Sequence, residues 1–239
     1  MTRDPFRLDG EVALVTGSVT GIGNALARGL AHAGARVVLN GRNRDKLEAI
    51  AASLRGEGIT ASVFPADVTD VPGLTATLSA AAAELGRIGV MSYSPGATWD
   101  HAPGRVPDLA AMGITSALET TPESARAQFD LLMAGALAAS RAVLPAMRQA
   151  GDGALLFTTG MSAVIPMAMM GSTGIATAGL RNWASAVRDD LAKDGVYVGH
   201  VSIGLPIMPG SGEGDPDAIA ERWFQLAHAR DTFEATIGF

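Results

Sequence analysis

The sequence contains no cysteine. This absence excludes disulfide bonds, thiolate nucleophiles and cysteine-ligated zinc or iron–sulfur sites. It also fits a cytoplasmic protein, and the polar N-terminal segment, which lacks the apolar core of a secretory signal peptide, leads to the same expectation. No two histidines have the spacing of a metal-ligand pair, so the sequence predicts no metal site.

Charged residues are also scarce: they make up 18% of the 239 residues, against 48% apolar residues, and the formal net charge is −6. So apolar a composition predicts a folded chain. The net acidity and the lack of any Lys/Arg cluster predict neither a nucleic-acid nor a membrane partner. The longest uncharged stretch, residues 153–180, resembles a membrane span, but its proline, glycines and hydroxyl residues favour a buried strand, a loop and the start of a packed helix.

Short apolar runs alternate with Ala- and Leu-rich segments of helical spacing. The pattern predicts strands at residues 12–15, 36–39, 61–64, 90–91, 154–158 and 196–201, and a short seventh strand after residue 233. It predicts helices at residues 24–33, 44–54, 73–85, 123–149, 173–193 and 218–229. Parallel strands need helical crossovers, so this alternation predicts an α/β fold, a Rossmann-like doubly wound parallel sheet in a single domain over residues 1–239.

The first predicted strand ends in a glycine-rich turn, and a helix follows it. The turn reads Thr16-Gly17-Ser18-Val19-Thr20-Gly21-Ile22-Gly23. Gly17 permits the tight turn, Gly21 lets the backbone approach a pyrophosphate, and Gly23 lets the helix pack on the strand. The helix N-terminus supplies amide donors and a positive dipole. In this context the turn favours dinucleotide binding over an ordinary strand–helix connection.

The second predicted strand ends at Asn40-Gly41-Arg42-Asn43. NAD-binding proteins usually place an acidic residue here, where it binds the ribose 2′-hydroxyl. No acid is present, and Arg42 could pair with a 2′-phosphate. The sequence therefore favours NADP(H) over NAD(H), and the alternative for Arg42 is a solvated arginine at the start of a helix.

Together these features resemble the short-chain dehydrogenase/reductase superfamily over nearly the whole chain. The matching segments are the glycine turn, Asp67-Val68, Gly96 after the fourth strand, Arg141-Ala-Val-Leu-Pro145-Ala-Met147, and the strand that ends in Thr158-Thr159. The resemblance implies that the glycine turn binds NAD(P), that Asp67 contacts the adenine and that Val68 packs beside it. It also implies carbonyl reduction or alcohol oxidation.

Members of this superfamily often form dimers or tetramers through two long helices, which correspond here to residues 123–149 and 173–193. The second of these segments carries small, uncharged residues that would allow close helix approach: Gly174, Ala176, Ala178 and Gly179. The resemblance therefore implies a homo-oligomer, either a dimer or a tetramer.

The catalytic residues of the superfamily do not carry over to this chain. The family uses an asparagine, a serine and a Tyr-x-x-x-Lys pair, and the corresponding positions hold Leu132, Gly160, Thr173 and Thr177. The only lysines are Lys46 and Lys193, and neither lies four residues after a tyrosine. A threonine hydroxyl is far too weak an acid at neutral pH to replace an activated phenol.

Tyr93 is a candidate replacement for the proton donor. It stands at the end of the fourth predicted strand, where the family usually has an asparagine and where open α/β sheets bind ligands. The alternative is a packed tyrosine whose hydroxyl bonds to the backbone. The lack of a lysine that would tune the Tyr93 pKa favours this second interpretation.

Other polar side chains have weaker claims. Asp100 and His101 form either an acid/base pair over the pocket or, more in keeping with their loop, an exposed pair. Thr159 and Ser162 could hydrogen-bond a substrate oxygen, and His200 has the position of a sheet histidine. Four methionines in one segment could accommodate a small apolar substrate or could be core: Met161, Met167, Met169 and Met170.

Three functions stay open at this point. The first is an atypical NADP(H)-binding oxidoreductase with an altered active site and an unknown substrate. The second is a catalytically inactive nucleotide-binding pseudoenzyme that acts as a regulatory or interaction subunit. The third is non-redox chemistry on an apolar ligand, such as a cyclisation or a dehydration.

Overall fold

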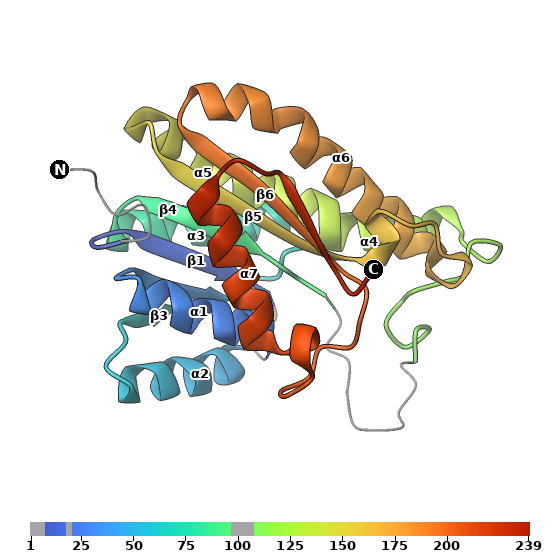
Figure 1. The fold of residues 1–239 in the computed structure, drawn as a ribbon, viewed down its shortest axis with the longest axis horizontal. Coiled ribbons are helices and arrows are strands. Elements are labelled where there is room, and N and C mark those ends of the chain that lie inside the picture. The colour runs from blue at the N-terminus through green and yellow to red at the C-terminus, as the bar shows by residue number, and fades with distance from the viewer. Residues whose placement is uncertain (1–7, 18–20, 97–107) are drawn as a thin grey trace.

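A computed structural model describes residues 8–17, 21–96 and 108–239. Seven parallel strands form one sheet in the order β3-β2-β1-β4-β5-β6-β7 (Figure 1). The strands are β1 (Val12–Thr16), β2 (Arg36–Asn40), β3 (Ala61–Val63), β4 (Ile88–Tyr93), β5 (Gly153–Gly160), β6 (Val196–Ile203) and β7 (Glu234–Ile237). The order reverses between β1 and β4, which is the switch point of a doubly wound sheet. The predicted fold class is therefore confirmed.

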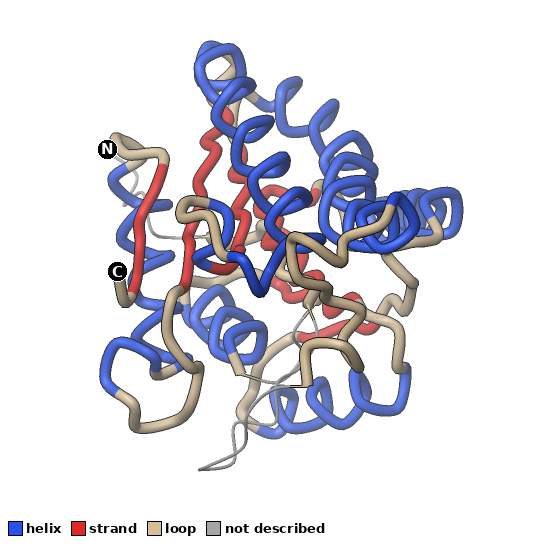
Figure 2. The backbone as a smooth tube through the Cα atoms, turned by 90° about the vertical axis from the view of Figure 1, so that its right-hand side faces the viewer, coloured by secondary structure: helices blue, strands red, loops and turns tan. Residues whose placement is uncertain are grey.

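Helices cover both faces of the sheet, and Figure 2 shows the strands lying between them. One face carries α1 (Ile22–His32), α2 (Arg44–Gly56) and α7 (Pro216–Ala229). The other carries α3 (Val71–Leu85), α5 (Gly135–Ala150) and α6 (Gly171–Lys193). Because both faces are covered, the central strands are buried along their whole length and read as continuous apolar runs.

Side-chain caps fix where several helices begin. Asn43 accepts from the backbone N–H of Lys46 at α2, and Asp70 accepts from that of Gly73 at α3. Asp215 caps α7 in the same way. These caps satisfy amide groups that have no partner within the helix, which is why Asn and Asp stand at these positions.

Three helical segments follow one another before β5: α4 (Pro122–Phe129), a π-helical turn η1 (Asp130–Ala134) and α5. The sequence predicted one long helix here, and the path is continuous but contains the π turn. By length and composition alone this helix could cross a membrane. It packs on α3, β4 and β5, as the core helix of a layered fold does.

Helix α6 corrects one expectation about the surface. Ala176 was placed on an exposed small-residue face, but it is buried together with Thr173, Thr177 and Leu180. These positions recur at helical spacing and form the stripe that faces the sheet. Ala178 and Gly179 are exposed, as predicted.

Short 3₁₀ turns shape the chain near the carboxyl ends of β5 and β6. They are η2 (Met161–Ala163), η3 (Ala168–Met170) and η4 (Gly212–Gly214). The segment before α4 folds against the start of α6, since the Thr115 amide donates to Ser172 Oγ at 3.0 Å and the Ala117 amide donates to the Ala168 carbonyl at 2.7 Å. The start of α6 is thereby fixed between two loops.

Strand register places one lateral row of side chains across the sheet. Register partners in a parallel sheet point to the same face. The row lies on the α6 face and consists of Asn40, Thr16, Tyr93, Phe157, His200 and Glu234. Asn40, Thr16 and Tyr93 are the last residues of their strands, at the edge where ligands bind in such sheets. His200 lies in the middle of β6, and Glu234 is the first residue of β7.

Candidate active site

The glycine turn has the backbone that its sequence predicted. Gly17 has φ +87°, and a Cβ at this position would lie 2.5 Å from backbone atoms of Ser94 and Pro95, so only glycine fits. Gly21 has φ +72°, and a Cβ there would meet no described atom within 4 Å. Among the described residues the turn is therefore tight at Gly17 and open at Gly21. Ser18 and Thr20 lie outside the described residues.

The N-terminus of α1 is free of competing groups among the described residues. Its N-cap, Gly21, makes no side-chain cap, and no acidic residue stands in its first turn. Ile22 and Gly23 are buried and pack the helix against β1. The first amides and the positive end of the helix dipole are thus available to an anion.

Several buried polar atoms near this turn have no hydrogen-bond partner within the part of the chain that the structure describes. They are Thr16 Oγ1, Asn24 Oδ1, Asn40 Oδ1 and Ser92 Oγ. Buried polar groups in folded proteins are nearly always paired. Thr16, Asn40 and Ser92 stand at or next to the carboxyl ends of adjacent strands, so the edge next to the glycine turn has unused capacity for a polar ligand.

Arg42 and Asp67 lie close enough for the guanidinium to affect the carboxylate. Partial burial opposes ionisation of Asp67, but bonds from the Thr69 amide and hydroxyl, at 2.9 and 2.8 Å, and the charge of Arg42 lower the pKa of Asp67. Asp67 is therefore a carboxylate that holds its own loop. Val68, the next residue, is buried in the core beside α5.

Gly96 follows β4, is exposed, and would have open space around an added Cβ. Arg42 is exposed beyond β2. Arg42 beyond β2 and Gly96 beyond β4 are thus both accessible to solvent at the carboxyl edge of the sheet.

Tyr93 is completely buried, and its hydroxyl donates to the Leu131 carbonyl at 2.8 Å. In an α-helix the Gly135 amide would donate to the Leu131 carbonyl. In the π turn it donates to the Asp130 carbonyl instead, so the Leu131 carbonyl is left without this bond. The Tyr93 hydroxyl occupies the place of that amide. Burial, assisted by the charge of Asp67, raises the Tyr93 pKa far above its usual value. This geometry favours a packed tyrosine over a proton donor.

Gly135 makes room for the Tyr93 side chain. A Cβ on Gly135 would lie 2.2 Å from Tyr93 Oη and 2.7 Å from the Val68 carbonyl oxygen. No side chain fits without displacement of backbone, so Tyr93 and Gly135 depend on each other. This dependence could not be read from the sequence, because the two residues are far apart in the chain.

Two of the four positions that the resemblance matched to the catalytic set lie in the first turns of α6, and a third lies in the π turn, which packs against α6. Thr173 and Thr177 are buried on the inner side of α6, and Leu132 is buried in the π turn. Among the described residues, a Cβ on Gly160 would meet only the Ile203 carbonyl, at 3.9 Å. A side chain at position 160 would therefore meet few described atoms, whereas Thr173 and Thr177 are packed against protein.

The hydroxyls of Thr173 and Thr177 take part in hydrogen bonds with neighbouring protein groups. Thr173 Oγ1 donates to Gln128 Oε1 at 2.7 Å, and Gln128 Nε2 donates to the Gly113 carbonyl at 3.2 Å. The hydroxyls of Thr177 and Ser162 lie 3.3 Å apart. All four side chains are buried. The hydroxyls of Thr173 and Thr177 thus bond to protein groups, as they would in a packed interior.

A second polar chain, which the sequence did not predict, runs through the last three strands. Thr159 Oγ1 lies 2.9 Å from His200 Nε2, and His200 Nδ1 lies 2.9 Å from Glu234 Oε1. Arg181 of α6 binds both oxygens of Glu234 at 2.6 Å. His200 is a sheet histidine, as expected, but it also links a hydroxyl to a carboxylate.

Burial lowers the pKa of His200, against the opposing effect of Glu234, so the imidazole is neutral near pH 7. The bonds from Arg181 lower the pKa of Glu234 despite its partial burial. An ionised carboxylate can only accept, so it fixes the proton on His200 Nδ1 and leaves Nε2 as an acceptor for the Thr159 hydroxyl.

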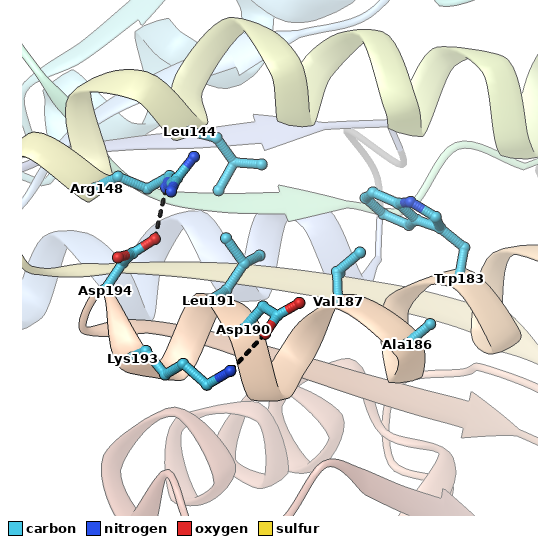
Figure 3. Close-up of a pocket in the computed structure, with 9 residues that line it drawn as sticks. All are labelled: Leu144, Arg148, Trp183, Ala186, Val187, Asp190, Leu191, Lys193 and Asp194. Atoms are coloured by element: carbon cyan, nitrogen blue, oxygen red, sulfur yellow. Dashed lines mark hydrogen bonds and ion pairs between the residues drawn. The ribbon is translucent and has the colours of Figure 1, made fainter.

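A surface groove lies between α5 and α6 (Figure 3). Leu144, Trp183 and Val187 line it, and the ion pair between Arg148 and Asp194, at 2.6 Å, closes one end. That end precedes β5 and β6 directly, so it lies at the amino ends of the strands. The groove is thus far from the glycine turn and belongs to a different surface.

The methionine-rich segment is not core. Met169 is 56% exposed, and its neighbours Val164 and Ile165 are also exposed. Met161, Met167 and Met170 are half-buried. Asp100 and His101 lie outside the described residues. Within the described ranges, no group of three His, Asp or Glu side chains gathers in a way that could hold a metal ion.

Comparison with known proteins assigns the chain to a family. The family model "short chain dehydrogenase" matches residues 11–206. The chain is 30% identical over 198 residues to the cis-4-hydroxycyclohexanecarboxylate dehydrogenase of Sinomonas cyclohexanicum, which covers 83% of the chain and 74% of that protein. This chain belongs to the short-chain dehydrogenase family.

Two further relatives bear on the site. The chain is 45% identical over 91 residues to the D-threitol dehydrogenase of Mycolicibacterium smegmatis, a match that spans only 38% of the chain and 35% of that enzyme. Among solved structures, a metagenomic short-chain oxidoreductase in complex with NADP is 27% identical, with a TM-score of 0.78 and coverage of 96% of both chains.

Proposed function

We propose that this protein is an NADP(H)-dependent oxidoreductase whose active site departs from the usual one of its family. The observation that carries the proposal is the open glycine turn in front of an uncapped α1, with Arg42 where NAD-binding sites carry an acid. The relative that was solved in complex with NADP supports the choice of cofactor. A bound nicotinamide cofactor would supply hydride transfer.

The residues present fit such a cofactor. The first amides of α1 and the outer side of Gly21 would hold the pyrophosphate, and the unpaired oxygens of Thr16 and Asn40 offer polar partners beside it. Arg42 would bind the 2′-phosphate, while Asp67 and Val68 would lie at the adenine. The exposed apolar side chains around Met169 suit a small apolar substrate. A cytoplasmic location stays a prediction.

A second function, a nucleotide-binding pseudoenzyme, has one observation in its favour. The hydroxyl of Thr173, at the position of the family's tyrosine, donates to Gln128 and is buried. Neither Thr173 nor Thr177 is disposed as a proton donor, so a chain that relied on these positions would bind nucleotide without turnover.

Calorimetric titration with NADP⁺ and NAD⁺ tests the proposed cofactor. Wild type should bind NADP⁺ more tightly, and Arg42→Ala should lose this preference, since one charge-assisted contact contributes about 1.5–3 kcal/mol. Arg44→Ala, which removes the neighbouring positive charge at the start of α2, is the control and should keep the preference. Equal affinity of wild type for both nucleotides would refute the choice of NADP(H).

We also propose a homo-oligomer through α4, α5 and α6. Phe129 and Ile175 are large apolar side chains that are 42% and 59% exposed, and the small residues Ala178 and Gly179 lie beside Ile175 on the outer side of α6. Together they give an apolar surface that allows close helix approach. The number of subunits, two or four, stays open.

A further inference from the structure

The Thr159–His200–Glu234 chain has the arrangement of an activated hydroxyl. In such sites a hydroxyl donates to an imidazole nitrogen, and a carboxylate orients the ring from the other nitrogen. Here both bonds are 2.9 Å long, and the three side chains come from β5, β6 and β7. Three adjacent strands hold the groups, so their geometry is fixed by backbone pairing rather than by flexible loops.

The Thr159–His200–Glu234 hydrogen-bond chain runs across the sheet toward its carboxyl edge. Glu234 is the register partner of His200, and Phe157 is its partner on the other side. Thr159 lies two residues beyond Phe157 on the same face and directly precedes Gly160, so the bond from His200 runs diagonally toward the carboxyl edge. Thr159 therefore brings the chain to the edge where the proposed cofactor and substrate meet.

At its other end, at Glu234 and Arg181, this hydrogen-bond chain reaches solvent. The side chain of His200 is 0% exposed, that of Glu234 is 19% exposed, and that of Arg181 is 37% exposed. The Thr159 hydroxyl can donate to His200 Nε2 at 2.9 Å or to the Gly160 carbonyl at 3.4 Å, and the shorter contact favours His200. Thr159 then keeps an oxygen lone pair, and the Ser202 hydroxyl lies 3.3 Å away as a further partner. A buried imidazole between an edge hydroxyl and a carboxylate is disposed to take up a proton from the edge.

We propose that Thr159 is the catalytic hydroxyl of this site and that His200 and Glu234 act through it as positioning residues of a proton relay. The proposal rests on the proposed function. The imidazole takes up the proton and the threonine hydroxyl only passes it on, so no strongly acidic hydroxyl is needed at the position of the family's tyrosine. Arg181 keeps Glu234 ionised, and among the described residues the charged groups that act on His200 are Arg181 of α6 and Glu234 of β7. The Phe233 ring stacks on the imidazole, with centroids 5.9 Å apart, and holds its plane.

The chemistry balances in the direction of alcohol oxidation. A bound oxidised nicotinamide would accept a hydride from the substrate carbon, while the substrate hydroxyl gives its proton to Thr159 Oγ1. Thr159 passes its own proton to His200 Nε2. The products are a ketone or aldehyde, the reduced cofactor and an imidazolium ion that Glu234 stabilises. After the product leaves, the proton returns through Thr159 to water, and carbonyl reduction follows the same steps in reverse.

One experiment tests the hydrogen bonds of the relay without measuring turnover. The protonation state of His200 can be measured by ¹⁵N NMR of the four histidines. The signal that disappears in His200→Gln assigns His200. In the wild type, the His200 ring should be neutral, with Nδ1 protonated and Nε2 unprotonated. Thr159→Val should shift the Nε2 resonance, whereas Thr158→Val should not, because Thr158 faces Trp223 of α7 on the opposite side of the strand. Protonation on Nε2 in the wild type would overturn the relay.

A second experiment reads catalysis. Oxidation of a panel of secondary alcohols by NADP⁺ should fall about 10²–10⁴-fold in kcat for Thr159→Val, while the Kd for NADP⁺ stays unchanged. Thr159→Ser should recover most of the loss, Thr158→Val should behave as wild type, and Glu234→Gln should move the pH profile of kcat. A purely structural role would not produce this pattern.

The outcomes separate the two proposals. If NADP⁺ does not bind to wild type by calorimetry, the proposed function fails, and the catalytic role of Thr159 fails with it. If NADP⁺ binds but no alcohol in the panel is oxidised, or if Thr159→Val oxidises alcohols as fast as wild type, the relay is overturned while the cofactor site stands.

Discussion

The hydroxyl of Tyr93 donates a 2.8 Å hydrogen bond to the carbonyl oxygen of Leu131, so one side chain joins the end of β4 to the π turn of the long helix. The same bond holds the tyrosine hydroxyl in the interior of the protein, where the side chain is completely buried. A residue type that would suggest catalysis in another setting therefore stabilises a helix defect here.

Tyr93→Phe should lower the free energy of unfolding by about 1–3 kcal/mol, because a buried carbonyl loses a hydrogen bond. Urea unfolding measures the change. Tyr197→Phe is the matched control, since the Tyr197 hydroxyl donates to the Thr232 carbonyl at 2.7 Å and should cost a similar amount. NADP⁺ affinity and turnover should stay at the wild-type level in both variants. If folded Tyr93→Phe loses turnover while Tyr197→Phe does not, Tyr93 acts as a proton donor and the structural interpretation is wrong.

Gly135→Ala should be destabilising by about 1–3 kcal/mol or more, because the new methyl group would overlap Tyr93 Oη and the Val68 carbonyl. Gly56→Ala, at a helical position with nothing within 4 Å, should be neutral or stabilising. In a double-mutant cycle, Tyr93→Phe and Gly135→Ala should cost less together than the sum of their single effects. Strict additivity would show that the two residues are not coupled.

The stability of the wild type should fall as the pH drops below about 6.5. The folded-state pKa of His200 is lowered by burial, so between the two pKa values the unfolded chain binds a proton that the folded chain does not. The contribution of His200 to the free energy of unfolding is complete above its pKa in the unfolded chain. It is lost as the pH falls toward the pKa of His200 in the folded chain. Glu234, whose pKa is also lowered, loses its contribution in a more acidic window, starting near pH 4.5.

Urea unfolding of wild type and His200→Gln between pH 8 and pH 5 checks this expectation. The difference at pH 8 gives the pH-independent cost of the substitution, and the variant should show a flatter decline toward pH 5. Parallel curves for the two proteins would mean that His200 does not titrate differently in the folded and unfolded states.

Wild type should be a dimer or a tetramer by light scattering at micromolar concentration. Ile175→Glu should shift it toward the monomer, because a charge would be buried at the close helix approach. Val71→Glu alters an exposed apolar residue at the start of α3 and should leave the assembly unchanged. A wild-type monomer would refute the proposed interface.

The fold and the glycine turn could be predicted because each rests on local pattern. The apolar runs gave the strands, including the last one at Glu234–Ile237, and Gly17 and Gly21 fall where a tight and an open turn need them. The ends of the elements moved by a few residues, as at β4, which begins at Ile88. The family resemblance predicted the positions of the catalytic set, and two of these, Thr173 and Thr177, lie in the first turns of α6.

The parts that could not be predicted depend on register and on distant pairs. His200 and Glu234 meet only because β6 and β7 pair in one register, and no local feature of either segment fixes that register. The same holds for Gly135, whose small size makes sense only beside Tyr93. Ala176 was misplaced because composition alone does not say which side of a helix faces the sheet.

The position of Glu234 in β7 has a consequence for shortened chains. Thr159 and His200 can pair once the chain has been made as far as β6, but the carboxylate that orients the imidazole comes from the last strand of the sheet. A chain cut before residue 234 would therefore lack the carboxylate that orients the imidazole, even if β5 and β6 still paired. The relay is complete only in a chain that extends through β7.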